Sequence, residues 1–206
     1  MDNNFKSLYD ECLKEYSRQH QKFLTTALSR GEVVVVITTS RKMARIYRWM
    51  LKSGFITLPK DTVVISEYAI CFCMDELVKM YGKRLKVLIT DDLVNTGKTV
   101  ENIAQYVIAY THIKPYFLPF LLSEDESYLS NVKIVGAPQK VGKGFCSYAT
   151  MRNVDNILSI GMPIDMEYPI LNISMPRNWD SSVLLNILQE EFPGCSVYPS
   201  IHGISD

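Results

Sequence analysis

Between residues 33 and 138, short runs of apolar residues alternate with segments whose apolar residues recur at helical spacing. The apolar runs read EVVVVITT, TVVISEY, KVLITD, YFLPFLL and VKIVGAP. Continuous β-branched runs such as VVVVI are typical of strands buried on both faces, as in parallel sheets. Strand and helix patterns that alternate at this short spacing indicate a doubly wound sheet. The sequence therefore predicts an α/β fold, an open parallel sheet flanked by helices.

The segments between and around these runs predict the helices and the outer parts of the fold. Residues 5–28 keep one helical face apolar, which predicts one long helix or two short ones that end at Gly31. Ser40 is a candidate N-cap and Gly54 follows the end of the next helix. Two more helices are expected, ICFCMDELVKMYG and KTVENIAQYVIAYTH. After Gly142 the candidates are the strands PILNISM and CSVYPSI, and the helix SVLLNILQEEF.

A chain of 206 residues is long enough for one α/β domain with a full core. No repeat, low-complexity segment or Pro/Ser-rich linker divides it. We therefore expect a single domain over residues 1–206. It should consist of an amphipathic N-terminal helix over 1–30, an α/β core over 31–140 and a C-terminal addition over 141–206.

Composition limits the kinds of partner and the cellular compartment that are expected for this chain. The chain carries 22 basic and 22 acidic side chains, so neither nucleic acid nor an acidic membrane surface is expected as a partner. The longest apolar stretches have strand length, and the N-terminus lacks the pattern of a signal peptide. The five cysteines have no paired spacing, so a reducing, cytoplasmic location is expected. A small-molecule ligand is the expected partner, and the amphipathic first helix leaves a homodimer open.

The segment VLITDDLVNTGKTV, residues 87–100, carries the strongest chemical signal. Two acids, Asp91 and Asp92, end an apolar strand and precede a loop that suits phosphate. A P-loop is excluded, because its leading glycine would stand at position 92, where a carboxylate would face the phosphates. The backbone N–H groups of residues 95–99 instead converge at a helix N-terminus, which favours an anion. Gly97 allows close approach of that anion.

The order of acids and loop constrains the ligand. The carboxylates accept hydrogen bonds and tolerate a metal, but they repel a second phosphate. The expected ligand therefore carries a phosphate at one end, and vicinal hydroxyls or a bound Mg²⁺ one sugar ring away. Ribose 5-phosphate fits that description.

The same segment resembles the signature of type I phosphoribosyltransferases: an apolar strand, two acids, two apolar residues, a variable residue and T-G-x-T. The resemblance covers residues 33–138 and implies 5-phosphoribosyl 1-pyrophosphate as ligand. It implies that Asp91 and Asp92 hold the ribose hydroxyls, and Mg²⁺ through water or substrate. The residues that it implies for the 5′-phosphate are Asn95, Thr96, Gly97, Lys98 and Thr99. A chance acidic turn before a capped helix is the alternative.

The family's pyrophosphate loop follows the first core strand. The residues at that place are Thr39, Ser40, Arg41 and Lys42. Arg41 and Lys42 can neutralise pyrophosphate oxygens, and Arg41 joins the two acids in the implied catalytic set. Both loops follow parallel strands, so both should lie at the carboxyl edge of one sheet. Many family members carry a glycine in this loop and this chain has none, so a helix N-terminus with surface basic residues is the alternative.

The resemblance implies a glycosyltransferase of nucleotide metabolism that displaces pyrophosphate at ribose C1 with a nucleobase-like acceptor. Positioning and electrostatic stabilisation would supply most of the catalysis. One departure concerns Asn95, which stands where relatives using 6-oxopurines have an aspartate base. An asparagine takes no proton at neutral pH, so hypoxanthine and guanine are disfavoured as acceptors.

A second departure concerns the mobile loop that the family places between its second and third core strands. Here that interval reads YAICFCMDELVKMYGKRL, which is apolar and helical in pattern. Its basic residues Lys79, Lys83 and Arg84 are candidates to reach the site. A mobile segment would favour transfer, whereas a rigid, buried helix would favour the alternative function. That alternative is a non-catalytic module that binds 5-phosphoribosyl 1-pyrophosphate or a nucleotide as a regulator, or as a stress or defence accessory.

Residues 161–176, GMPIDMEYPILNISMP, form a further candidate site. Asp165 and Glu167 alternate with apolar residues and would face the same side of a strand. They are candidates for a hood that recognises the acceptor, and a solvated strand face is the alternative.

Overall fold

The computed structural model describes residues 3–39, 43–44, 46–47, 50–51, 54–60, 62–123, 129–141, 170–175 and 196–201. The helices are α1 (Asn3–Ser29), α3 (Ile70–Tyr81) and α4 (Lys98–Thr111), with short 3-10 turns η1 (Glu67–Ala69) and η2 (Gly82–Arg84). The strands are β1 (Val33–Thr38), β2 (Thr62–Ser66), β3 (Leu85–Val94), β4 (Tyr116–Ser123), β5 (Lys133–Ile134), β6 (Gln139–Val141), β7 (Ile170–Met175) and β8 (Ser196–Ile201). The described residues between 43 and 51 are also helical.

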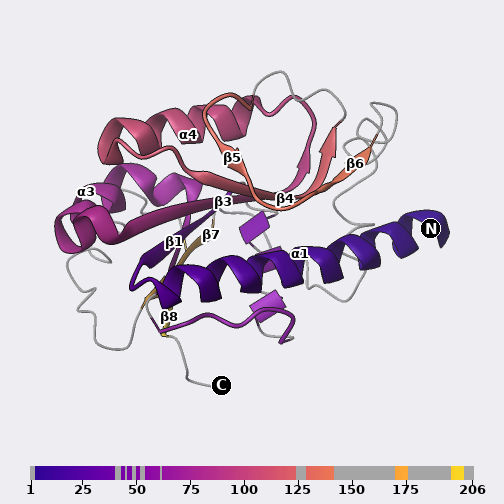
Figure 1. Ribbon diagram of the computed structural model, residues 1–206, viewed down its shortest axis with the longest axis horizontal. Coiled ribbons are helices and arrows are strands. Elements are labelled where there is room, and N and C mark those ends of the chain that lie inside the picture. The colour runs from indigo at the N-terminus through magenta and orange to yellow at the C-terminus, as the bar shows by residue number, and fades with distance from the viewer. Residues whose placement is uncertain are drawn as a thin grey trace.

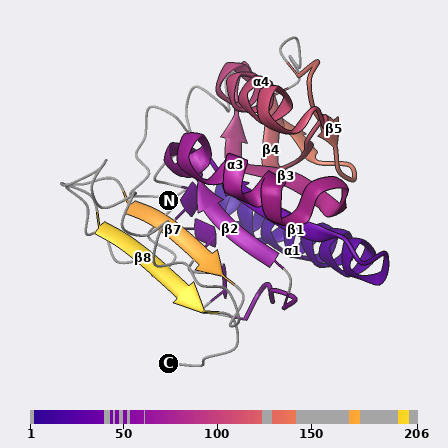
Figure 2. The same ribbon diagram turned by 90° about the vertical axis from the view of Figure 1, so that its left-hand side faces the viewer.

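A parallel sheet lies at the centre of the fold. Strands β5, β4, β3, β1 and β2 follow one another in that order and are all parallel, and β6 also pairs with β4. β7 joins β2 in antiparallel fashion and β8 joins β7. Figure 2 shows these two strands beyond β2, away from β5. The expected α/β fold with an open parallel sheet is confirmed, and the two predicted C-terminal strands extend the sheet.

Helices cover both faces of this sheet. Figure 1 shows α1 along one face and α3 with α4 on the other. Val34 and Val36 of β1 pack on the α1 side with Leu24, whereas Val35 and Ile37 pack on the α3 and α4 side. Because alternate residues of a strand face opposite sides, β1 needs apolar residues at every position. This explains the continuous run VVVVI.

Two strands differ from the predicted bounds. The third strand was expected to end at the acid pair, but β3 continues to Val94, which pairs with Leu122 of β4. Of the fifth predicted strand, VKIVGAP over residues 132–138, only Lys133–Ile134 form a strand, β5, and a second part of the same sheet edge, β6, begins beyond it at Gln139. Gly136, with a φ of 70°, and Pro138 lie between the two parts and interrupt regular pairing. The helix predicted over 182–192 lies outside the described residues.

A buried polar cluster joins α1 to the rest of the core. The Tyr16 hydroxyl lies 2.7 Å from Thr90 Oγ1 of β3, and His20 Nε2 lies 2.6 Å from the Tyr47 hydroxyl. The Tyr16 ring also stacks on Phe120 of β4, with ring centroids 4.1 Å apart. The helix is therefore positioned by specific polar contacts as well as by its apolar face.

His20 predicts a measurable pH dependence. Burial lowers the pKa of His20 to about 3, whereas an unfolded histidine has a pKa of about 6.5. Between these values the unfolded state binds a proton and the folded state does not, so stability falls as the pH drops below about 6.5. From pH 7 to pH 5, wild type should lose about 2 kcal/mol more unfolding free energy than His20→Gln. Urea titrations at both pH values measure this difference, and equal losses would contradict it.

Candidate functional site

The order of strands in the sheet reverses between β1 and β3. The chain moves outward from β1 to β2 on one side, then returns to β3 and continues outward to β4 and β5 on the other. In open parallel sheets, ligands bind at the carboxyl ends of the two strands where the order reverses. Here those ends carry Thr39, which follows β1, and the acid pair Asp91 and Asp92 in β3. Thr39 and the acid pair therefore both lie at this switch point.

The structure brings the start of the expected pyrophosphate loop beside the acid pair. β1 pairs with β3 as far as Thr38 and Thr90. The Thr39 N–H then donates to the Thr90 carbonyl at 3.0 Å, so Thr39 lies beside the residue that precedes Asp91. The other residues expected in this loop lie outside the described part of the chain: Ser40, Arg41 and Lys42. The same holds for the hood candidates, Asp165 and Glu167.

Two hydroxyls at this edge of the sheet are buried and have no hydrogen-bond partner among the described residues. They are Thr39 Oγ1, after β1, and Ser66 Oγ, at the end of β2. An unpaired buried polar group costs about 1–3 kcal/mol, and such groups are rare in folded proteins. A polar ligand atom at the end of β1 would give the Thr39 hydroxyl a partner.

The acid pair lies where β3 has passed the end of β1. From Asp91 onward, the described strands give β3 only β4 as a partner, with Asp91 opposite Pro119. Asp91 is half-buried and Asp92 is 5% exposed. The Asp92 N–H donates to Asp91 Oδ1 at 2.9 Å, which orients the first carboxylate. Both acids thus lie next to the switch point, within β3 and not in the loop that follows it.

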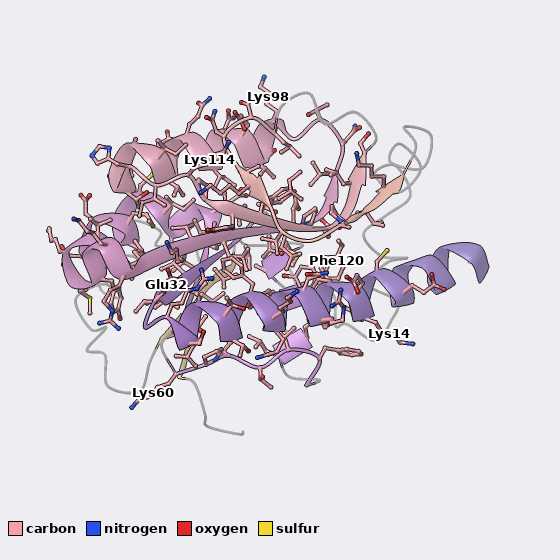
Figure 3. All side chains as sticks on the ribbon, viewed as in Figure 1. Lys14, Glu32, Lys60, Lys98, Lys114 and Phe120 are labelled. Atoms are coloured by element: carbon pink, nitrogen blue, oxygen red, sulfur yellow. The ribbon has the colours of Figure 1, made fainter. Side chains whose placement is uncertain are left out.

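The loop after β3 has a backbone conformation that suits an anion. Gly97 is the N-cap of α4 and has left-handed dihedral angles, φ 77° and ψ −2°. A residue with a Cβ would be strained there by about 1–2 kcal/mol. The first N–H groups of a helix have no acceptor within the helix, and their partial positive charge attracts anions. Figure 3 shows the Lys98 side chain pointing away from the protein, and the Lys98 N–H donates to Thr96 Oγ1 at 3.4 Å.

A buried carboxylate anchors the start of α4. Glu101 accepts hydrogen bonds from Ser130 Oγ at 2.6 Å and from the Asn131 N–H at 3.1 Å, and also from the Asn131 side-chain amide. These bonds join the first turn of α4 to the segment before β5. Glu101 carried no distinguishing signal in the sequence, because an acid in the first turn of a helix is common.

This anchor can be tested by its effect on stability. Glu101→Ala should lower the free energy of unfolding by about 2 kcal/mol, because part-buried hydrogen bonds from Ser130 and Asn131 to a charged carboxylate are lost. Glu76→Ala is the control, since its ion pair with Lys79 is exposed to solvent and should contribute little to stability. Urea titrations measure both. Similar losses in the two variants would contradict the anchoring role.

The interval between β2 and β3 is a packed helix. Cys73, Met74 and Leu77 of α3 are fully buried in the core that α3 shares with the sheet. Gly82 follows the helix, and the chain enters β3 directly after η2. The predicted helix is confirmed, and it belongs to the core.

The basic residues of this interval do not lie at the candidate site. Lys83 and Arg84 belong to η2, which immediately precedes the amino end of β3. Arg84 Nε donates to the Gly31 carbonyl at 2.8 Å, before the amino end of β1. Lys79 pairs with Glu76 near the end of α3. The expectation that these residues reach the site is therefore wrong, because the carboxyl edge is at the opposite end of the strands.

Comparisons with known proteins complete the description. Among the residues that the structure describes, no three or more His, Cys, Asp or Glu side chains gather as metal ligands, and no helix could cross a bilayer. Neither a scan against protein-family models nor a search of curated proteins gives a match to this chain.

Proposed function

We propose that this chain binds 5-phosphoribosyl 1-pyrophosphate with Mg²⁺ at the switch point and displaces its pyrophosphate with a nucleobase-like acceptor. One observation carries the proposal, the placement of three different features at one edge of the sheet. They are the acid pair of β3, the glycine-capped start of α4 and the buried hydroxyl of Thr39. Each suits a different part of this ligand. The acid pair suits the ribose hydroxyls, the start of α4 suits the 5′-phosphate, and the Thr39 hydroxyl suits the pyrophosphate.

The charges of the site support this orientation of the ligand. A carboxylate accepts hydrogen bonds from hydroxyls about twice as strongly as a neutral acceptor does, so Asp91 and Asp92 favour the ribose. They repel phosphate, which favours the N-terminus of α4 instead. Arg41 and Lys42 follow Thr39 in the sequence, and in this proposal their charges offset that of the pyrophosphate.

The acid pair also fits a magnesium ion that is held together with the substrate. Mg²⁺ in phosphate sites usually takes one or two protein carboxylates, and water and substrate oxygens complete its coordination. Asp91 and Asp92 are the residues that would hold it. When bound, the ion would neutralise charge on the departing pyrophosphate.

Binding without turnover is a second candidate function, and α3 favours it. Transfer through an oxocarbenium-like transition state requires a cover that excludes water. The interval in which such a cover is expected is a helix whose Met74 and Leu77 are fully buried. In this case the chain would sense 5-phosphoribosyl 1-pyrophosphate or a nucleotide as a regulator or a stress or defence accessory.

A phosphorus NMR time course separates the two candidates. Wild-type protein is mixed with 5-phosphoribosyl 1-pyrophosphate and Mg²⁺, with and without a mixture of common bases. Transfer predicts free pyrophosphate that accumulates only when an acceptor is present. Sensing predicts shifted ligand signals without release of pyrophosphate. Ligand signals identical to those of a protein-free sample would contradict both candidates.

A further inference from the structure

The outer edge of β4 is open at its centre. β5 pairs with β4 at Tyr116 and Phe117, and β6 pairs with it from Leu121 to Ser123. Between these two pairings, neither β5 nor β6 pairs with Pro119. Because proline has no N–H, Pro119 presents no unpaired backbone donor at this gap.

A cavity of about 230 Å³ adjoins this gap. Its walls come from α1, from residues 118–120 of β4 and from residues 135–138 between β5 and β6. The rings of Tyr16 and Phe120, both in the walls, stack at an interplanar angle of 4°. Figure 3 shows Phe120 between the sheet and α1. An apolar cavity of roughly 150 Å³ accommodates benzene, so this one has room for a small ring with substituents.

One wall of the cavity lies beside the strand that carries the acid pair. Pro119, in the wall of the cavity, pairs with Asp91 across the β3–β4 ladder, and neighbouring strands lie about 4.8 Å apart. The Tyr16 hydroxyl lies 2.7 Å from Thr90 Oγ1, and Thr90 directly precedes Asp91. A ligand in the cavity therefore lies within the length of one small molecule of the proposed ribose site.

The polar side chains of the cavity are mainly hydrogen-bond acceptors. The Tyr16 hydroxyl is engaged with Thr90, and Gln19 Nε2 donates to Glu15 Oε1 at 2.6 Å. Gln19 Oε1 is left as an acceptor. The amide of Gln19 lies directly over Gly136, where a Cβ would come within 2.7 Å of Gln19 Cδ. Gly136 thus allows the close approach that places Gln19 at the cavity.

The charge of the cavity is negative. Glu11 and Glu15 line it, and no lysine or arginine is among the described residues of its walls. Glu15 is paired with Arg18 at 2.6 Å. Glu11 makes no hydrogen bond or ion pair with any residue that the structure describes, so its carboxylate is available to a ligand. The remaining walls include apolar residues such as Leu118 and Val135.

We propose that this cavity is the acceptor subsite, and that it takes a small planar ring with an amino or amidine group. The N–H groups of such a ring match Glu11 and Gln19 Oε1, and its faces match the apolar walls. A carboxylated ring would meet uncompensated negative charge.

As an acceptor subsite, the cavity depends on the proposed function. In the transfer step, the lone pair of an acceptor nitrogen forms a bond to ribose C1. The C1–oxygen bond breaks with its electrons on pyrophosphate, and the nitrogen's proton passes to solvent.

Benzamidine and benzoate are matched probes, because they share a ring and differ in charge. Ligand-observed NMR measures the affinity of each for wild type, Glu11→Gln and Gln19→Leu, with Glu76→Gln on α3 as the control. We expect benzamidine to bind wild type and the control equally, and about fivefold to tenfold more weakly to Glu11→Gln. Gln19→Leu should also weaken it, and benzoate should bind none of the proteins.

The position of the cavity is tested by interligand NOEs between benzamidine and the ribose H1 of 5-phosphoribosyl 1-pyrophosphate. Cross-peaks in wild type support the acceptor subsite. If both ligands bind and no cross-peak appears, the subsite assignment is wrong. Benzoate binding as tightly as benzamidine, or unchanged benzamidine affinity in Glu11→Gln, would overturn the proposed chemistry. Benzamidine binding that needs Glu11 in a protein without affinity for 5-phosphoribosyl 1-pyrophosphate would overturn the proposed function, but leave the chemistry of the cavity standing.

Discussion

The Asp91→Asn/Asp92→Asn variant is expected to bind 5-phosphoribosyl 1-pyrophosphate at least about 100-fold more weakly than wild type in the presence of Mg²⁺. Each hydrogen bond to a charged group contributes about 1.5–3 kcal/mol, so replacing both carboxylates removes at least about 3 kcal/mol. The substitution keeps the size of each side chain. Titration calorimetry measures the affinity, and circular dichroism checks that the fold is kept.

The chain offers a matched control for this variant. Asp75 and Glu76 are also neighbouring acids, but both are exposed on α3. Asp75→Asn/Glu76→Gln removes the same charge from the molecule and should leave the affinity unchanged. An equal change in the two variants would mean that net charge, and not the acid pair of β3, governs binding.

Leu77→Ala is expected to lower the free energy of unfolding by about 3 kcal/mol, because it opens a cavity where α3 packs on the sheet. Leu77 is fully buried, whereas Met80 on the same helix is 46% exposed. Met80→Ala should therefore cost less than about 1 kcal/mol. Urea titrations of the two variants provide the comparison.

The stability of the Leu77→Ala variant also bears on whether the chain catalyses transfer or only binds its ligand. A large loss places α3 in the folded core, and a cover for the transition state would then have to come from another part of the chain. A loss below about 1 kcal/mol would contradict the packing described for α3. It would also make a mobile cover at residues 70–81 tenable again.

Strong local patterns made much of the fold predictable. The run VVVVI predicts β1, because a strand with a core on each face needs apolar residues at every position. The bounds of α1, α3 and α4 follow from helical periodicity and from the glycines that end or begin them, such as Gly31 and Gly97. Alternating strands and helices then predict the parallel sheet.

The candidate site was only partly predictable, because long-range contacts leave little trace in a sequence. The acids and Gly97 stand out as a local motif. The hydrogen bond between Tyr16 and Thr90 joins residues 74 positions apart, and each of them taken singly is an ordinary residue of an α/β core. The cavity beside β4 depends on the gap between β5 and β6, which only the paired structure shows. The continuation of β3 to Val94 likewise depends on its pairing with β4.

The most direct test of the ribose-phosphate site is a map of backbone amide NMR shifts during titration with 5-phosphoribosyl 1-pyrophosphate and Mg²⁺. We expect the largest shifts at residues 95–100, with further shifts at Thr39, Asp91 and Asp92, and none at residues 75–81 of α3. Saturable shifts confined to this pattern would locate the ligand at the switch point between β1 and β3. No shifts, or shifts centred elsewhere, would contradict the ribose-phosphate site.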